Sequence, residues 1–299
     1  MKKIFIFGFF GLLIVACSND SSFSPLKLLR YKEPLSKIFT GINKIGVISE
    51  TGETTPILFN GSVYLIHDIG KNFEILDENG GLVHTQNANV EYVSGFVNNG
   101  TAYVFGSEWR AHDKILLYYS TDLINWSGPI TVYSGDGLKL FNTSVIKRYN
   151  DFLMAIEFLE DDFFKTKFLK SDDLVRWTKD GAVMFPQYYT AAPTIRYIAP
   201  YHYVFYTSES DPAIHHSYNL NVARSLDLIS WQDSNIQVIA ASQEPQNNAS
   251  DLDFVEFNGK LQIYYLNNSQ AMQKPLPGAG LIKSEYNGTL KQFAEEFFK

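Results

Sequence analysis

Short apolar runs separated by turn residues recur along most of the chain. The run Thr55–Phe59 passes through Asn60-Gly61 into Val63–Ile66, and an Asn-Gly pair between two apolar runs is the strongest short-range signal for a β-hairpin. The pattern predicts five hairpins, at residues 55–66, 93–105, 144–156, 194–206 and 254–265. Long stretches with a helical period are missing, apart from a predicted short helix at Leu290–Phe298. We therefore expect an all-β protein.

A heptapeptide with the pattern S-x-D-L-x-x-W occurs three times, at residues 120–126, 171–177 and 225–231. Its tryptophans, Trp126, Trp177 and Trp231, follow one another at intervals of 51 and 54 residues, a period typical of repeated supersecondary units such as propeller blades. We expect the motif to form a turn in which the Asp accepts backbone N–H groups, the Leu fills the space between blades and the Trp packs on the adjacent sheet. A role of these tryptophans as sugar platforms is the less favoured alternative.

Each hairpin from the second to the fourth is followed by a strand that runs into the heptapeptide, and a further strand follows the tryptophan, as at Ile130–Tyr133 and Ile236–Ile239. Four antiparallel strands per unit and five units predict a five-bladed β-propeller. The first and last units lack the heptapeptide, and since a propeller ring must close, we expect an N-terminal strand near Lys44–Ile48 to complete the fifth blade. Residues 31–299 would then form a single propeller domain.

The N-terminus has the pattern of an export signal. Lys2 and Lys3 precede an apolar run of 12 residues, Ile4–Val15, which is too short for a permanent membrane span. Ile14-Val15-Ala16-Cys17 resembles a bacterial lipobox, which implies removal of residues 1–16, lipidation of Cys17 and a flexible tether over residues 17–30. The alternative is an ordinary secretory signal with a chance cysteine. We expect a lipid-anchored protein of the bacterial cell envelope, touching the membrane only through its anchor.

Charge and composition limit the kinds of binding partner that we expect. The formal charge is −7, and loss of Lys2 and Lys3 would make it −9, which argues against nucleic acid as a partner. Aromatic residues make up 15% of the chain, which suits packed strands and also suits stacking on sugar rings. Cys17 is the only cysteine, so the chain can form no internal disulfide. We expect a monomer without a cofactor, and no metal site, because His215 and His216 are adjacent and lack a spaced third ligand.

Propeller topology indicates where chemistry belongs. If the innermost strands start at the pocket mouth, their first residues and the loops after the second strands face the pocket, whereas the heptapeptides lie at the opposite end. A pocket with aromatic walls suits a sugar, and hydrolysis of a glycosidic bond there would need two carboxyl groups, about 5–5.5 Å apart for retention of configuration and about 6.5–9.5 Å apart for inversion. The predicted catalytic carboxylates are those at these positions: Glu157, Glu209, Asp251, Asp253 and Glu91. Glu53 occupies a similar position but is interpreted as a solvated loop residue.

The densest polar and aromatic cluster is Trp109-Arg110-Ala111-His112-Asp113. Arg110 can fork onto sugar oxygens, His112 can bond a hydroxyl and Trp109 can stack on a sugar ring. An ion pair between Arg110 and Asp113 is the alternative. The predicted substrate-binding residues are Trp109, Arg110, His112, Asp113, His67 and Gln270.

The heptapeptides, together with the strand pairs Ala192-Pro193-Thr194-Ile195 and Tyr203–Ser208, resemble the five-bladed propeller glycosidases of glycoside hydrolase family 43 and its relatives. The resemblance covers residues 50–297 and implies carboxylate-based hydrolysis of glycosidic bonds in a central pocket. Two positions depart from it. Where family 43 commonly places a Glu before a Pro, this chain has Ala192-Pro193, and the middle Asp position reads Phe141-Asn142-Thr143.

Two hypotheses follow from these patterns. The first is a glycoside hydrolase that acts on the ends of oligo- or polysaccharides with two carboxylates in the propeller pocket. The alternative is a carbohydrate-binding propeller lipoprotein without catalysis. A structural scaffold is a third reading, and no Ser-His-Asp motif, phosphate loop or nucleotide fingerprint points to other enzymology.

Overall fold

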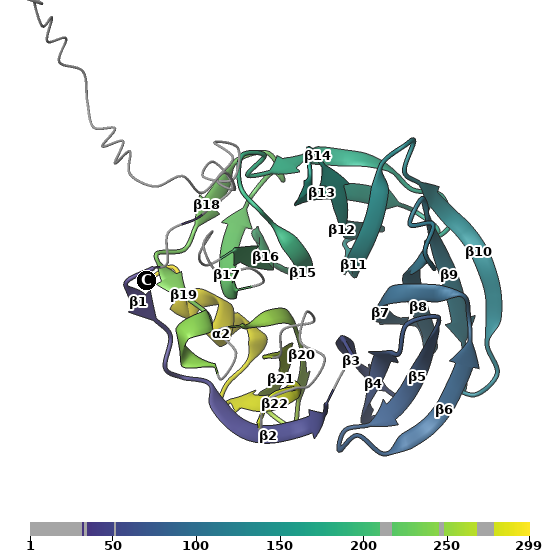
Figure 1. The fold of residues 1–299 in the computed structure, drawn as a ribbon, viewed down its shortest axis with the longest axis horizontal. Coiled ribbons are helices and arrows are strands. Elements are labelled where there is room, and N and C mark those ends of the chain that lie inside the picture. Colours follow the sequence, from purple (N-terminus) through teal and green to yellow (C-terminus); the bar gives the residue numbers. More distant parts are fainter. Residues whose placement is uncertain (1–31, 33–34, 51, 210–216, 245–247, 268–277) are drawn as a thin grey trace, which may run out of the picture.

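The computed structural model describes residue 32 and residues 35–50, 52–209, 217–244, 248–267 and 278–299. Five four-stranded antiparallel sheets stand in a ring around a central axis (Figure 1), which confirms the predicted five-bladed β-propeller. The five predicted hairpins supply the two innermost strands of every blade.

Each blade consists of four strands that run in order from the axis to the rim. Blade 1 contains β3 (Thr54–Phe59), β4 (Ser62–Asp68), β5 (Asn72–Asp77) and β6 (Leu82–Asn87). Blade 2 contains β7 (Val90–Asn98), β8 (Thr101–Glu108), β9 (Lys114–Ser120) and β10 (Ser127–Ser134). Blade 3 contains β11 (Lys139–Arg148), β12 (Asp151–Glu160), β13 (Phe163–Ser171) and β14 (Thr178–Met184). Blade 4 contains β15 (Ala191–Ile198), β16 (Tyr201–Glu209), β17 (Tyr218–Ser225) and β18 (Trp231–Asp233).

Blade 5 joins the two ends of the domain. Its inner strands are β20 (Ser250–Phe257), β21 (Lys260–Leu266) and β22 (Leu281–Tyr286), and its outer strand is β2 (Asn43–Ser49), which pairs antiparallel with β22. The expected closure by an N-terminal strand is therefore confirmed. The strand expected at Ile236–Ile239 is only partly confirmed. The outer strand of blade 4 is the short β18, but Ile239 of this run still bridges Leu220 of β17 in antiparallel fashion. The first part of the run, β19 (Ile236–Gln237), pairs in parallel with β1 (Lys37–Ile38).

The three heptapeptides form the turns between the third and fourth strands of blades 2, 3 and 4, as predicted. In each turn the Asp side chain accepts two backbone N–H groups; Asp173, for example, accepts those of Val175 and Arg176 at 2.9 and 2.8 Å. The leucine has a positive φ, near +65° at Leu174, and packs between two blades. Trp177 packs edge-on against Phe105 of the preceding blade at 6.0 Å between ring centroids.

The core is divided into five apolar clusters, each shared by two neighbouring blades. The largest, between blades 4 and 5, is covered by the helix α2 (Leu290–Glu296), which confirms the predicted C-terminal helix. Thr289 caps this helix by accepting the N–H of Gln292 at 3.2 Å, and Phe293 and Phe297 insert into the cluster. The clusters hold the blades in register and leave the axis to the inner strands.

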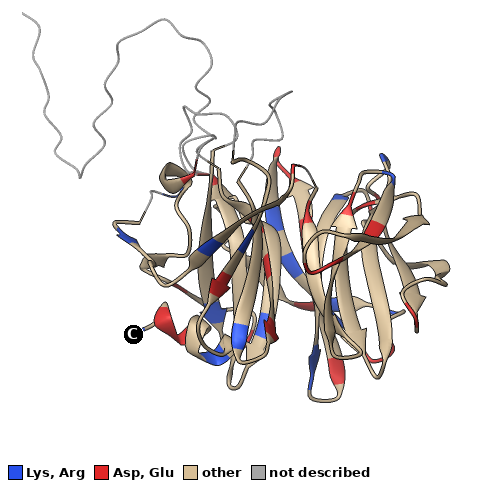
Figure 2. Cartoon of the chain, turned by 90° about the horizontal axis from the view of Figure 1, so that it is seen from below, with Lys and Arg blue, Asp and Glu red and all other residues tan. Residues whose placement is uncertain are grey.

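Charged residues of both signs are intermingled over the strands and turns in the side view of the molecule (Figure 2). None of the helices in the described ranges is long and apolar enough to cross a membrane. Cys17 and the tether lie outside the described residues, so the lipid anchor stays a prediction.

Candidate active site

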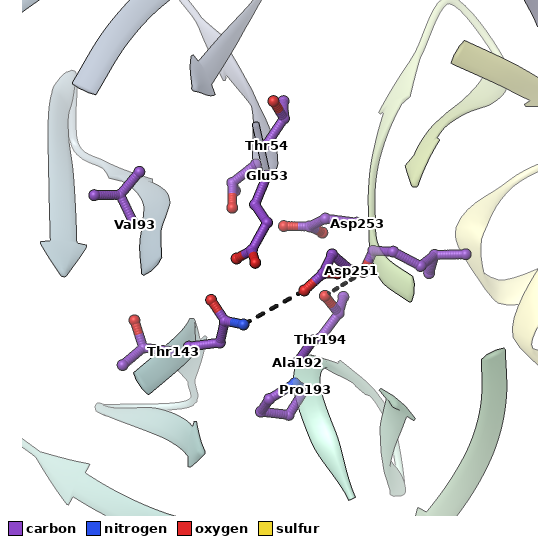
Figure 3. A pocket seen from close by; sticks show the side chains of 12 residues that line it. Glu53, Thr54, Val93, Thr143, Ala192, Pro193, Thr194, Asp251 and Asp253 are labelled. Carbon is purple, nitrogen blue, oxygen red and sulfur yellow. Dashed lines mark hydrogen bonds between the residues drawn. The ribbon is translucent and has the colours of Figure 1, made fainter. Parts of the chain in front are cut away.

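A cavity of about 150 Å³ opens on the axis at the end where the inner strands begin. Its carboxylates are Glu53, just before β3, Glu157 of β12 and Asp251 of β20. A narrower space of about 30 Å³ continues from it along the axis and is also lined by Glu53 and Asp251, but not by Glu157. In the close view of this space, Glu53, Asp251 and Asp253 extend toward the centre of the ring (Figure 3). A space of that size holds roughly one water molecule.

Asn142 joins two of the carboxylates. Its Nδ2 atom lies 3.3 Å from Oε2 of Glu157 and 3.4 Å from Oδ1 of Asp251. These two oxygens therefore lie no farther apart than the sum of those distances, 6.7 Å. Glu157 and Asp251 therefore form a close pair of carboxyl groups held on one amide nitrogen.

β-Bulges turn the first residues of the inner strands toward the axis. Four inner strands carry one extra residue at this end, as between Ala191 and Thr194 and between Ser250 and Asp253. Ala192 and Asp251 have positive φ values of 43° and 53° there. The turned backbone presents the N–H of Ala192 to Glu157 Oε2 at 2.7 Å, so a carboxylate from blade 3 is held by blade 4.

The site keeps one carboxyl group protonated. Burial raises the pKa of Glu157 to about 8; the negative charge of Asp251 adds to this, while the bonds from Ala192 and Asn142 oppose it. Burial also raises the pKa of Asp251, to about 6. At neutral pH Glu157 therefore carries a proton while Asp251 is mostly ionised, the division of roles that acid–base hydrolysis requires.

An aromatic wall lines one side of the cavity. Phe141 packs against Tyr92 at 5.3 Å and against Phe164 at 4.9 Å, and the series continues through Tyr189 to Tyr218. All five rings line the 150 Å³ cavity. A wall of ring faces and edges beside carboxylates suits the CH groups and hydroxyls of a sugar.

Glu91 and His112 lie beside the cavity but outside its lining. The carboxylate of Glu91 accepts the backbone N–H of Arg110 at 2.8 Å and lies 3.2 Å from Nε2 of His112. The His112 ring stacks on Phe141, with 4.9 Å between centroids, so it supports the aromatic wall from behind. The structure thus engages Glu91 in a local pair instead of presenting it to the cavity.

The rest of the polar cluster faces away from the cavity. The Arg110 guanidinium lies on the ring of Trp109, 4.0 Å from its centroid, with Lys71 at 5.5 Å from the same ring. Asp113 lies 3.8 Å from the Lys114 ammonium, so it pairs with Lys114 and not with Arg110. Neither cavity is lined by Trp109, Arg110 or Asp113.

Glu209 does not correspond to Glu157, although both follow apolar runs. In blade 3, Ile156 pairs with Thr143 beyond the bulge, and in blade 4 Phe205 pairs with Thr194, so Tyr206 is the residue equivalent to Glu157. Glu209 lies three residues farther along β16 and lines neither cavity. The expected equivalence was wrong because strand ends do not mark the same level in different blades.

The remaining predicted residues have other partners. Asp253 lines the narrow space, where its carboxylate is held by the Arg196 guanidinium and the N–H of Phe254. His67 is buried, bonds the hydroxyl of Thr54 at 2.9 Å and lines neither cavity. Gln270 lies outside the described residues.

Sequence reasoning missed Glu53 and the aromatic wall. Glu53 is half-buried and lines both cavities, so its interpretation as a solvated loop residue was wrong. Glu53 directly precedes an inner strand, and this position in the sequence could have indicated that its side chain faces the pocket. The rings lie at the ends of strands in three different blades and, for Tyr189, in a connecting loop, and no periodic pattern connects them.

Comparisons with known proteins show a likeness in fold to solved structures. No protein-family model matches the chain, and no curated protein matches it. Among solved structures, a thermostable family 43 glycoside hydrolase has a TM-score of 0.61 at 12% identity, covering 83% of this chain and 91% of that one. A family 43 endo-arabinanase from Bacillus licheniformis has a TM-score of 0.58 at 13% identity, covering 81% and 96%.

A family 32 β-fructofuranosidase from Bombyx mori has a TM-score of 0.59 at 10% identity and covers 81% of this chain. This chain spans 61% of the length of that enzyme. The identities are low, so these likenesses establish the propeller fold of the family 43 and family 32 glycosidases. The function itself has to be argued from the site.

Proposed function

We propose that this protein is a glycoside hydrolase that removes units from the ends of oligo- or polysaccharides in its central pocket. The observation that carries the proposal is the pair of carboxyl groups, Glu157 and Asp251, held on one amide nitrogen in a cavity whose surroundings keep Glu157 protonated. A closed ring with a cavity of about 150 Å³ favours a chain end over the middle of a polymer.

Glu157 serves as the general acid in this mechanism. It donates its carboxyl proton to the glycosidic oxygen as the bond from that oxygen to the anomeric carbon breaks. Asp251 stays ionised beside it and keeps the proton on Glu157 until the substrate oxygen takes it.

Glu53 serves as the general base. It lines both cavities, including the narrow space that holds roughly one water. Glu53 takes a proton from that water as the water oxygen bonds to the anomeric carbon. Because water activated by Glu53 displaces the leaving group in a single step, this mechanism predicts inversion of configuration.

Hydrolysis of aryl glycosides by the protein lacking residues 1–17 tests this assignment. Glu157→Gln should lower kcat/KM by about 10²–10⁴-fold on substrates with poor leaving groups and by much less on dinitrophenyl glycosides, whose leaving group needs no proton. Glu53→Gln should impair both substrates equally. Glu209→Gln is the matched control, since Glu209 lines neither cavity, and it should leave both rates unchanged.

Equal activity of Glu157→Gln and the unchanged protein on every substrate would refute the acid assignment. Binding of sugars without turnover by the unchanged protein would instead support the second candidate, a carbohydrate-binding propeller. That candidate is favoured by Asn142 and Ala192, which stand where family 43 commonly has carboxylates.

We further propose that Cys17 is lipidated and anchors the domain in the cell envelope. Incorporation of labelled palmitate by the full chain, and its loss in Cys17→Ser, tests this proposal.

A further inference from the structure

Another cavity lies at the opposite end of the propeller, beside the turns that connect strands within blade 3 and within blade 4. It has a volume of about 660 Å³ and is lined by residues of the β11–β12 and β15–β16 turns and of two heptapeptides. These residues are Arg148, Tyr149, Asn150, Asp151, Asp172, Tyr197, Pro200, His202 and Leu226. Along β11 the central pocket at Asn142 and this cavity at Arg148 are separated by about 20 Å, at 3.3 Å per residue.

Tyr149 is 75% exposed, a larger fraction than for any other large apolar or aromatic side chain in the described residues. Its position is nevertheless fixed. Its hydroxyl group bonds that of Tyr197, and the two rings meet edge to face with centroids 5.3 Å apart. Tyr197 in turn lies against the buried ring of His202 at 4.9 Å. A fixed and exposed ring face costs little entropy when a ligand stacks on it.

The walls of this cavity are polar and carry more carboxylates than cations, since the lining includes the exposed Asp172, so an acidic polysaccharide is disfavoured. The Arg148 guanidinium is held by Asp151 at 2.7 Å and by Asp180 at 3.1 Å. Burial lowers the pKa of His202, so its ring is neutral at pH 7. A stacking platform beside amide, hydroxyl and carboxylate groups matches a neutral sugar, with CH groups on one face and hydroxyls at its edge.

We propose that this cavity, with Tyr149 as its platform, is a second carbohydrate site that binds neutral polysaccharide chains. The choice of carbohydrate as the ligand rests on the proposed function. In this proposal the end of the propeller opposite the central pocket binds the polymer. Because the two sites lie at opposite ends, the second site affects retention on the polymer and leaves turnover of small substrates unchanged.

Affinity electrophoresis in native gels containing arabinan, arabinoxylan or inulin tests the proposal. The Glu157→Gln protein is used as the background so that the gel polymer is not degraded. At least one polymer should retard this protein, and adding Tyr149→Ala should weaken binding by about three- to tenfold. Tyr149→Phe keeps the ring face and should retain most of the binding. Tyr119→Ala, which removes an exposed tyrosine from blade 2, is the control and should migrate like the background.

Equal retardation with and without Tyr149, or no retardation by any of the three polymers, would overturn the second site. The outcome is independent of catalysis. If the unchanged protein hydrolyses no glycoside but its retardation depends on Tyr149, the proposed hydrolysis fails while the second site stands. If Tyr149→Ala in the otherwise unchanged protein slows aryl glycoside hydrolysis while its Tm is unchanged, the separation of the two sites is refuted.

Discussion

The acidity of Glu157 is set by neighbours that act in opposite directions. Burial and the charge of Asp251 favour the protonated form, whereas the N–H of Ala192 and the amide of Asn142 favour the carboxylate. Burial is the largest of these effects, and the pKa rises to about 8. The acid form is required for donation, so activity is retained below this pKa and lost as the pH rises through it.

This balance predicts the pH dependence of the enzyme. The alkaline limb of kcat/KM should lie near pH 8 in the unchanged protein. Asp251→Asn removes the negative charge that raises the pKa of Glu157, so the alkaline limb should move to lower pH. Rates measured from pH 5 to pH 10 on one aryl glycoside check both statements. An alkaline limb that stays in place would show that Asp251 has no electrostatic influence on the acid.

At the scale of single residues, the sequence predicts which carboxylates lie near the pocket better than it predicts which partners they bind. Glu157 and Asp251 were found because both lie where an inner or second strand approaches the pocket mouth. Glu91 lies in an equivalent position but bonds His112 and Arg110, and Asp253 bonds Arg196. Whether a carboxylate faces the axis or binds a nearby side chain or backbone N–H depends on one-residue bulges and on side chains from other blades, and neither leaves a periodic signal.

The heptapeptide turn is the element that the sequence predicts most fully. Every function expected of its Asp, Leu and Trp is found in the structure, because all the interactions of the Asp and the shape of the turn are local in sequence. The outer strand of blade 4 was only partly predicted, for the opposite reason. The apolar run at Ile236–Ile239 suggested a strand, but its pairing partner β1 lies at the far end of the chain.

Removing the Asp of one turn should reduce stability without reducing activity. Asp173→Ala loses the acceptor for two backbone N–H groups, and we expect the Tm to fall by about 2–4 °C. Asp172→Ala changes the adjacent exposed residue and serves as the control. Thermal unfolding and aryl glycoside hydrolysis of both variants check the prediction. A loss of activity in Asp173→Ala at a temperature where the protein is folded would contradict the placement of the turn at the end opposite the pocket.

At the scale of the whole molecule, the ring is held closed by a buried carboxylate. Glu244 accepts hydrogen bonds from Lys44 of β2 at 2.6 Å, from the Tyr265 hydroxyl at 2.8 Å and from Asn267 at 2.7 Å. Of these three partners, Lys44 is the one that comes from the N-terminal strand. The repeat period predicted the number of blades, and the need to close the ring predicted β2, whereas this cluster joins residues too far apart in sequence to be foreseen.

Breaking this cluster should destabilise the ring. Lys44→Ala leaves the Glu244 carboxylate buried without its cation, and the Tm should fall clearly. Adding Glu244→Gln removes the uncompensated charge and should recover part of the loss, a non-additive result that a double-mutant cycle measures. Lys260→Ala breaks the more exposed pair with Glu285 on the same blade and should change the Tm little. Equal losses in Lys44→Ala and Lys260→Ala would contradict the special place of Glu244.

The pairing of β2 with β22 also determines the order in which the blades can fold. β2 is synthesised before any other strand of the five blades and β22 after all of them, so β2 lacks its pairing partner until β22 has been made. Contacts between such distant segments are slow to form, because the entropy of closing a long loop is lost before the pairing is gained. Blades 1 to 4 can assemble in order of synthesis, while the fifth, and with it the cavity that needs all five, is completed last.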